Sequence, residues 1–584
     1  MKKILVSLTK RLNTLLELLA ALLGTYYSAR YALLSRRLAR PDVLRDSKRG
    51  FVIIQIDGLS YDHLCAAVEQ GYAPHLRRLL ERKEMVLYPW KPGIPGTTPA
   101  TQAGIMFGNS DPIPAFRWYD KQAGQAMVSS QPGVAQAIQA ELEQRAPGIL
   151  RGGSSYMNMF DGGASLALYT LGTFGKSRFF EGLRGLGFLT LFALNPFRSG
   201  TVLALAIWEY LTDLAQRAEA TVRRTNPRPL SRAFPFLRVM SSVVLRDIQT
   251  FSVTLDLFRG VPAIYTTFFG FDELAHNYGP LSKPALRALR AIDSRIRRLD
   301  RFRRMNLSRP YDLFLLSDHG MTEDIPFSNE YGQTLGDLVQ DLVGRSAAIR
   351  EFYSSQQPEM SSALFVQLEL EAIEASFRPP LSRIPHYLAS YVERRLPKEM
   401  TDQDYEPAQP SDVVVSSSGS LSHIYLNARP DQMELSQIAA LYPTLVSSLL
   451  SHPGIWLVIG RDAENTVILS KEGSLTIGEG GAGGVAHVEG QNPLSRLAYG
   501  DWAQRQLARL ASLNRSGDLI LIGAYDPDNQ RVSCFESQWA CHGGLGGPQD
   551  LAMLMTEPHI DWPLASVERA ASIYSLFTRQ YDIS

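Results

Sequence analysis

The stretch Phe314–Met321, FLLSDHGM, decides the fold expected for this chain. Its apolar run ends abruptly in Asp318, His319 and Gly320, which is typical of a buried strand whose C-terminal end presents a carboxylate beside an imidazole. In open α/β sheets, ligands bind just outside the carboxyl ends of the strands. Asp and His at such an edge suit a borderline divalent cation such as Zn²⁺. An isolated Asp-His pair is more often a polar strand end, so the interpretation depends on similar patterns elsewhere.

A similar pattern lies near the start of the chain. Phe51–Gly58, FVIIQIDG, is a short apolar run that ends in Asp57 and Gly58, and a segment with helical apolar spacing follows over Tyr61–Leu80. Asp57 can simply cap that helix, which is the common role of an Asp after a strand. As a metal ligand it needs partners from distant parts of the chain.

Two later segments offer such partners. A β-rich run leads to Asp272, and His276 follows four residues on, so both side chains share one face of a helical turn. His542 lies in the Gly-rich loop Ala540–Pro548, after the strand-like segment Asp518–Gly523. Taken alone, each pattern is weak. His423 and His487 are interpreted as residues that bind no metal.

A hydroxyl candidate lies in the Pro/Gly-rich stretch Trp90–Gly104. Pro99 suits the first turn of a helix, which places Thr97 or Thr98 at the helix N-terminus. Free backbone N–H groups and the helix dipole favour an anion there. The threonine is either a plain N-cap or a nucleophile ionised by a metal.

Composition excludes few classes of function. The 584-residue chain contains 59 Lys and Arg against 58 Asp and Glu, so net charge favours neither a nucleic acid nor an acidic partner. Its three cysteines, Cys65, Cys534 and Cys541, do not make a disulfide framework. Cys534 and Cys541 either pair or stay free in a reduced compartment.

The N-terminal segment, residues 1–48, combines basic residues with an apolar run over Leu15–Leu23. No small-x-small cleavage site follows, and a second basic cluster does not favour translocation. A basic amphipathic helix on a membrane surface fits as well as a signal-like segment. We therefore expect a membrane-associated protein. The sequence leaves two locations open, a bacterial-type envelope and the cytoplasmic face of a membrane.

Taken in order, these motifs resemble the alkaline phosphatase superfamily, and within it the type I phosphodiesterases and nucleotide pyrophosphatases. The resemblance covers residues 50–125, 262–322 and 515–550. It implies an α/β fold, an alkaline-phosphatase-like core with a mostly parallel sheet between helices, plus helical and α+β insertions.

The resemblance also implies two divalent metal ions, Zn²⁺ or alternatively Mn²⁺, about 4 Å apart. The first would be held by Asp57, Asp318 and His319, and the second by Asp272, His276 and His542. The first would ionise a threonine that forms a covalent phospho-enzyme, and water activated by the second would hydrolyse it.

Two residues depart from the family pattern. A Thr-x-Pro pattern selects Thr97 as the nucleophile, whereas the downstream Gln102 and Gly108 fit Thr98 better, and we favour Thr98. The family often has an Asn after the nucleophile helix, but this chain has Arg117 in that region, which can bind phosphate bidentately.

The expected organisation alternates core and insertion. The N-terminal segment is followed by core parts at 49–150, 261–325 and 516–584, a helical insertion at 151–260 and a second insertion at 326–515. Within the first insertion, Leu186–Ala193 and Val202–Trp208 are strongly apolar but each is too short to span a bilayer. They form either a hairpin that contacts lipid or a buried cap. Arg223, Arg224, Arg228 and Arg232 follow and can face lipid phosphates.

The sequence thus predicts a two-metal phosphodiesterase that acts on a phosphoester, which we hypothesise to be lipid-linked, and no scaffold for nucleic acid. A phosphoryl or phosphoethanolamine transferase and a phosphomonoesterase remain as alternatives, since the same site serves all three reactions. A catalytically dead membrane scaffold has no need of six metal ligands and a hydroxyl.

Overall fold

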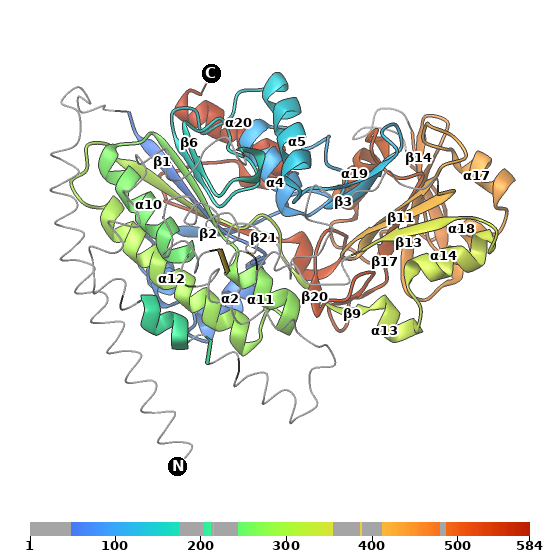
Figure 1. Cartoon of the computed structure of the whole chain (residues 1–584), viewed down its shortest axis with the longest axis horizontal. Coiled ribbons are helices and arrows are strands. Elements are labelled where there is room, and N and C mark those ends of the chain that lie inside the picture. Colours follow the sequence, from blue (N-terminus) through green and yellow to red (C-terminus); the bar gives the residue numbers. More distant parts are fainter. Residues whose placement is uncertain are drawn as a thin grey trace, which may run out of the picture.

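The computed structural model describes residues 48–173, 245–353, 411–478 and 486–583, with isolated positions between 200 and 243 and between 386 and 390. A seven-stranded sheet of order β2-β21-β8-β1-β7-β5-β6 lies at its centre (Figure 1). Its strands are β1 (Gly50–Ile56), β2 (Val86–Trp90), β5 (Ser154–Tyr156), β6 (Leu166–Leu168), β7 (Ala263–Phe268), β8 (Tyr311–Leu316) and β21 (Ala552–Thr556).

Most neighbours in this sheet are parallel. β1 pairs in parallel with β7 and β8, β5 pairs in parallel with β6 and β7, and only β21 runs antiparallel to its neighbours. The predicted α/β fold with a mostly parallel sheet between helices is confirmed.

Helices cover both faces of the sheet (Figure 1). Alternate residues of β1 enter separate cores, with Phe51 and Ile53 on one face and Val52 and Ile54 on the other. Burial on both faces explains why the strands read as continuous apolar runs. The first face is covered by α4 (Thr98–Phe107), α5 (Pro132–Arg145) and α20 (Ala570–Tyr581), and the second by α2 (Tyr61–Glu69), α3 (Pro74–Glu81), α10 (Arg246–Arg259), α11 (Gly270–Tyr278) and α12 (Lys283–Arg303).

A second, eight-stranded sheet has the order β10-β11-β12-β17-β13-β14-β15-β16 and lies beside the first (Figure 1). Its strands are β10 (Ile349–Phe352), β11 (Val413–Ser418), β12 (Leu421–Leu426), β13 (Ile455–Asp462), β14 (Asn465–Leu469), β15 (Gly473–Ile477), β16 (Ala486–Gly490) and β17 (Leu519–Gly523). One face packs on α19 (Gly500–Ser512), and the other on α14 (Leu335–Val343), α17 (Leu435–Leu441) and α18 (Leu445–Ser451).

Two smaller sheets complete the described part. The hairpin β3 (Arg117–Asp120) and β4 (Gln125–Val128) stands alone. A four-stranded sheet has the order β18-β19-β9-β20. It contains β9 (Thr322–Pro326), β18 (Tyr525–Asp526), β19 (Arg531–Cys534) and β20 (Ala540–Cys541), and α13 (Phe327–Tyr331) follows β9 directly.

The structure differs from the expected organisation at two boundaries. Residues 151–173 were assigned to a helical insertion, but β5 and β6 extend the central sheet through parallel pairing with β7. Residues 516–523 were assigned to the catalytic core, but β17 pairs with β12 and β13 in the eight-stranded sheet. The sequence does not reveal these pairings, because strand partners come from distant parts of the chain and short strands carry little periodicity of their own.

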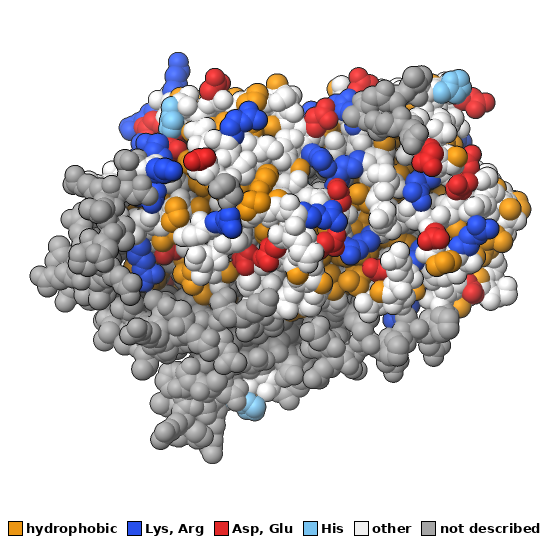
Figure 2. All heavy atoms as spheres, turned by 90° about the horizontal axis from the view of Figure 1, so that it is seen from above, with side chains coloured by type: hydrophobic (Ala, Val, Ile, Leu, Met, Phe, Trp, Pro, Cys, Tyr) orange, Lys and Arg blue, Asp and Glu red, His pale blue; other side chains and the backbone are white. Residues whose placement is uncertain are grey.

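Several expectations concern residues outside the described part. These are the N-terminal segment up to residue 47, the apolar run Leu186–Ala193, and the arginines at 223, 224, 228 and 232. Among the residues that the structure describes, no helix has the length and apolar character needed to cross a membrane. The face shown in Figure 2 carries basic and acidic side chains intermixed.

Candidate active site

The carboxyl ends of three adjacent parallel strands bring the predicted residues together. Asp57 follows β1, Asp318 and His319 follow β8, and Asp272 and His276 lie on α11, which begins two residues after β7. His542 arrives from the loop after β20. Since β8, β1 and β7 are neighbours in that order, residues 57 and 318 meet by construction of the sheet.

Short distances join these side chains into one cluster. Nε2 of His319 lies 3.5 Å from Oδ1 of Asp57 and 3.3 Å from Oδ2 of Asp318. The His319 ring stacks on His542, with 3.6 Å between ring centroids. Ligand atoms of Asp272, His276 and His542 lie within 4.8 Å of one another. The six predicted ligands therefore converge.

Asp272 belongs to two overlapping groups of possible metal ligands. Besides its group with His276 and His542, it forms a second group with Asp57 and His319, whose ligand atoms also lie within 4.8 Å of one another. The two sets that the resemblance implies are thus contiguous in space, as a pair of ions held close together requires.

The three histidines are oriented alike by the backbone. Nδ1 of His276 lies 2.7 Å from the carbonyl oxygen of Ala540, and Nδ1 of His542 lies 2.8 Å from that of Gly96. His319 Nδ1 makes the same contact, at 2.9 Å, with the carbonyl of Gly320. Because a carbonyl oxygen only accepts, each Nδ1 donates and each Nε2 is left to face the cluster. Metal-binding histidines are typically held in this way.

The electrostatics of the cluster call for a cation. Burial, followed by the neighbouring carboxylates of Asp318 and Asp272, raises the pKa of Asp57 well above its usual value. For His276, burial lowers the pKa, but the carboxylate of Asp272 outweighs it and raises the pKa to about 9. The same pairing lowers the pKa of Asp272 against the opposing effect of burial. The protein thus crowds carboxylates together away from water, which is costly unless positive charge lies among them.

Two buried oxygens support this conclusion. Oδ1 of Asp272 and Oδ2 of Asp318 accept no hydrogen bond from the described residues. Buried acceptors are normally satisfied, so unpaired ones inside a group of imidazoles indicate a missing partner. Carboxylate oxygens and imidazole nitrogens suit Zn²⁺ or Mn²⁺, and the residues present therefore fit the two metal ions that the resemblance implies.

Gly58 is needed where it stands. Its φ of +71° is in the left-handed region, and a Cβ there would lie 2.5 Å from Oδ1 of Asp272. Its amide also donates to Oδ1 of Asp318, at 3.3 Å. The glycine after Asp57 therefore lets the backbone of one strand end pass beside the carboxylates of the other two.

The two candidate nucleophiles differ sharply in position. Thr98, the first residue of α4, is half-buried, and its Oγ1 lies 3.3 Å from both Asp57 Oδ1 and His319 Nε2. Thr97 is the N-cap, is only 1% exposed, and its Oγ1 has no hydrogen-bond partner in the described part of the chain. Only the Thr98 hydroxyl thus contacts predicted metal ligands.

A buried amide network beneath α4 was not anticipated from the sequence. The network centres on Gln102. Its Nε2 donates to the side-chain oxygen of Gln55 at 3.1 Å and to the hydroxyl of Thr267 at 3.0 Å. Its Oε1 accepts from the Met159 backbone at 2.7 Å. Gln102 therefore ties α4 to β1 and β7, the strands that lead to Asp57 and Asp272. A polar residue inside the apolar face of a helix was the available signal.

Arg117 is engaged by a partner that the sequence did not reveal. It lies on β3, is mostly buried, and donates from Nη1 to Oε1 of Glu536 at 2.6 Å. Glu536 also accepts from the Gly419 amide and is almost fully buried. Its charge contributes to the raised pKa of His276, so the pair lies near the cluster.

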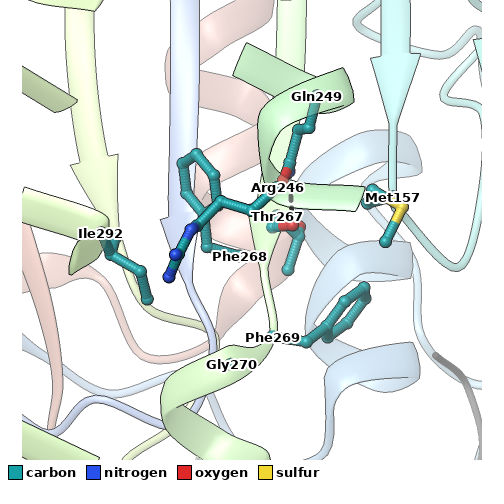
Figure 3. Close-up of a pocket in the computed structure, with 8 residues that line it drawn as sticks. All are labelled: Met157, Arg246, Gln249, Thr267, Phe268, Phe269, Gly270 and Ile292. Carbon is teal, nitrogen blue, oxygen red and sulfur yellow. Dashed lines mark hydrogen bonds between the residues drawn. The ribbon is translucent and has the colours of Figure 1, made fainter. Parts of the chain in front are cut away.

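A small pocket lies behind the first turn of α11 (Figure 3). Arg246 and Gln249 of α10 project toward the end of β7, and Gln249 Nε2 donates to the Thr267 carbonyl at 2.6 Å. The remaining lining residues are Met157, Phe268, Phe269, Gly270 and Ile292. None of the predicted metal ligands lines this pocket, so the pocket is separate from the cluster.

Comparison with protein families agrees with this geometry. The model of the type I phosphodiesterase/nucleotide pyrophosphatase family matches residues 192–401, a span that includes Asp272, His276, Asp318 and His319. The resemblance to this branch of the alkaline phosphatase superfamily is confirmed.

Individual relatives are distant. Human ectonucleotide pyrophosphatase/phosphodiesterase family member 1 is 30% identical over 145 residues, which is 23% of this chain and 15% of that protein. The chain thus spans a small fraction of the length of this curated relative.

Solved structures are similar at lower identity. Phosphonoacetate hydrolase from Sinorhizobium meliloti 1021 is 15% identical, with 91% of this chain and 96% of that chain covered and a TM-score of 0.46. Murine ectonucleotide pyrophosphatase/phosphodiesterase 5 is 11% identical, with 92% and 96% covered and a TM-score of 0.42. At these values the solved structures add nothing to the reaction expected of this chain.

Proposed function

We propose that this chain is a two-metal phosphodiesterase in which Thr98 is the nucleophile. The observation that carries the proposal is the position of the Thr98 hydroxyl, 3.3 Å from both Asp57 and His319 at the half-exposed start of α4. A hydroxyl nucleophile needs a group that removes its proton and a site that holds the phosphate. The family match, which spans four of the six predicted ligands, supports the same reaction class.

Each residue has a definite task in this proposal. The Thr98 hydroxyl loses its proton to water, and its oxygen attacks phosphorus to form a phospho-threonine. The bond from phosphorus to the leaving oxygen breaks, and that oxygen takes up a proton from water and departs as the alcohol. The free N–H groups at the start of α4 hold a phosphate oxygen.

Asp57, Asp318 and His319 would hold one cation, and Asp272, His276 and His542 the other. When bound, these cations supply Lewis-acid stabilisation of the attacking and leaving oxygens. Water then hydrolyses the phospho-threonine.

The first test compares a nitrophenyl phosphodiester with the matching monoester, with and without a chelator and added Zn²⁺ or Mn²⁺. We expect turnover that is lost with chelator, is restored by metal and favours the diester. A preference for the monoester would replace this proposal with a phosphomonoesterase and would favour Arg117 as a second phosphate clamp. No turnover of either ester by metal-loaded protein would instead favour a transferase that needs an acceptor.

We also propose that the substrate is lipid-linked and that the protein contacts a membrane surface. In the described part of the 200–214 segment, Leu203 is 61%, Ile207 54% and Leu211 54% exposed. Spaced four residues apart in helical positions, they form one apolar stripe, and Trp208 and Leu214 are also exposed. Exposed apolar stripes of this kind bind the interfacial region of bilayers.

Sedimentation with phosphatidylcholine vesicles, with and without anionic lipid, tests the membrane part. Replacing Leu203, Ile207 and Leu211 together with Ser should release the protein from the vesicles. The matched control replaces Leu281 and Leu441, which are 41% and 50% exposed on other surfaces, with Ser and should bind normally. Wild-type protein that stays in the supernatant at both lipid compositions would contradict the membrane contact without affecting the esterase proposal.

A further inference from the structure

A second group of possible metal ligands lies in the four-stranded sheet, apart from the predicted six. It consists of Asp324 on β9, Cys534 on β19 and Cys541 on β20, whose ligand atoms all lie within 4.8 Å of one another. Both cysteines are 0% exposed and Asp324 is 6% exposed. The two cysteines are free thiols in the structure. A buried carboxylate beside two buried thiols is uncommon in a protein core, because a charged group there normally has a partner of opposite charge.

The sheet places the three side chains on one face. β9 lies between β19 and β20. Cys534 is opposite Pro326, and Cys541 is opposite Thr322. Because residues two apart on a strand share a face, Asp324 points to the same side as both of these neighbours, and so lies between the cysteines.

This arrangement does not favour a direct disulfide. The cysteines lie on strands that are separated by β9, and two strand spacings amount to roughly 9–10 Å. A disulfide usually joins Cα atoms that are only about 4.4–6.8 Å apart. The two thiols are instead hydrogen-bonded to each other, and both sulfurs lie within 4.8 Å of a carboxylate oxygen of Asp324, so that all three donors can reach one ion.

The chemistry of this donor set selects the ion. Thiolates are soft ligands and select Zn²⁺ over Mg²⁺ or Ca²⁺, and a carboxylate oxygen is also a zinc ligand in proteins. The hydroxyl of Ser420 is hydrogen-bonded to Cys541 and so borders this group. Binding would release the two thiol protons to solvent.

We propose that Asp324, Cys534 and Cys541 form a structural Zn²⁺ site that supports the active-site edge. Cys541 directly precedes His542, and the carbonyl of Ala540 accepts from Nδ1 of His276. β9 begins three residues after His319. An ion held by these strands therefore fixes the segments that carry His319 and His542, and the carbonyl that accepts from His276. The site does not depend on the proposed reaction, because it uses none of the six predicted ligands.

Cobalt substitution tests this site by a spectroscopic signature. The predicted active-site ligands are oxygen and nitrogen atoms, so only a cysteine site gives a sulfur-to-cobalt charge-transfer band in the near ultraviolet. We expect full-length protein, stripped of metal under reducing conditions and titrated with Co²⁺, to show this band. Added Zn²⁺ should abolish it.

Variants assign the band to residues. Cys534→Ser and Cys541→Ser should each remove it and lower the bound zinc by one equivalent per chain. Cys65→Ser is the matched control, since Cys65 is the third cysteine of the chain and lies on α2, and it should keep the band. Thr98→Ala should also keep the band, whether or not the chain proves to be an esterase.

Two outcomes would overturn the proposal. One is wild-type protein that binds Co²⁺ without a sulfur-to-cobalt band, a result that needs no variant to fold. The other is a Cys534–Cys541 disulfide in protein purified without reductant and with its metals bound, shown by a mass two hydrogens lower and by blocked thiols.

Discussion

The buried histidines of the two large sheets are held in opposite ways. At the edge of the seven-stranded sheet, Nδ1 of His276 faces a backbone carbonyl and donates to it. In the eight-stranded sheet, Nδ1 of His423 on β12 accepts from the Gly517 amide at 2.9 Å. Burial lowers the pKa of both histidines, but the carboxylate of Asp272 outweighs this effect at His276, whereas the pKa of His423 falls to about 4. The hydrogen-bond partner of Nδ1 therefore separates a potential ligand from a neutral packing residue, and burial by itself does not.

The largest expected effect comes from the hydroxyl at the edge of the seven-stranded sheet. Thr98→Ala should lower kcat for the preferred ester by at least about 10⁴-fold, since removal of a nucleophile leaves only binding and electrostatic contributions. Metal content should not change. Steady-state kinetics with metal analysis provides the measurement.

Thr97→Ala is the matched control, because Thr97 precedes Thr98 and its hydroxyl contacts no predicted ligand in the described part of the chain. It should retain most of the activity. An inactive Thr97→Ala enzyme beside an active Thr98→Ala enzyme would reverse the assignment of the nucleophile.

A stability measurement isolates the histidine of the eight-stranded sheet. The pKa of His423 is about 4 in the folded chain and about 6.5 in the unfolded chain. Between pH 4 and 6.5, His423 therefore takes up its proton mainly on unfolding. Its contribution therefore weakens the fold as pH falls from 6.5 to 4, by about 3 kcal/mol. His423→Gln should flatten this acid limb in urea unfolding curves. An unchanged slope between pH 6.5 and 4 would show that other groups cause the acid loss.

The glycine beside the cluster tests how tightly the strand ends must approach. Gly58→Ala should weaken metal binding by about 10–100-fold, a typical effect of disturbing residues that orient the ligands. The cause is the 2.5 Å approach of the new Cβ to Asp272 Oδ1. Calorimetric titration with Zn²⁺ measures it.

Gly71→Ala is the control for backbone strain, because Gly71 has a similar φ of +77° with nothing within 4 Å of its Cβ position. Equal losses of metal affinity in the two variants would assign the effect to strain and not to the carboxylate.

The last prediction concerns His276 in protein stripped of metal. Its pKa of about 9 in the folded chain lies above the unfolded value, so its pairing with Asp272 contributes stability below about pH 6.5. That contribution is lost as pH rises to 9, which is opposite in sign to the response of His423. Chelated wild-type protein should lose more stability between pH 6.5 and 9.5 than chelated His276→Gln. Parallel pH profiles would contradict the pairing.

Much of the candidate site was accessible from local patterns. Apolar runs that end in Asp57 and in Asp318 predicted two buried strands, and the structure makes them neighbours in parallel register. The i, i+4 spacing of Asp272 and His276 predicted a shared helix face, and both lie on α11. These features depend on residues close in sequence, where backbone periodicity alone decides which side chains share a face.

Other features had no local signal. Glu536 is 419 positions from Arg117, and Gln102 meets Thr267 across 165 positions. No pattern in the sequence pairs such residues, because their contact depends on the order of the strands. For the same reason β5, β6 and β17 were assigned to the wrong part of the chain.

The sequence by itself determined the strand ends, the residue types of the six predicted ligands and the family resemblance, since each is written in short runs of adjacent residues. Only the tertiary structure decided that the Thr98 hydroxyl, and not that of Thr97, reaches Asp57 and His319. It also decided that Cys534 and Cys541 lie on either side of Asp324. The physical reason is that a one-residue step around a helix N-terminus, or the insertion of one strand between two others, redirects a side chain without changing the local sequence pattern.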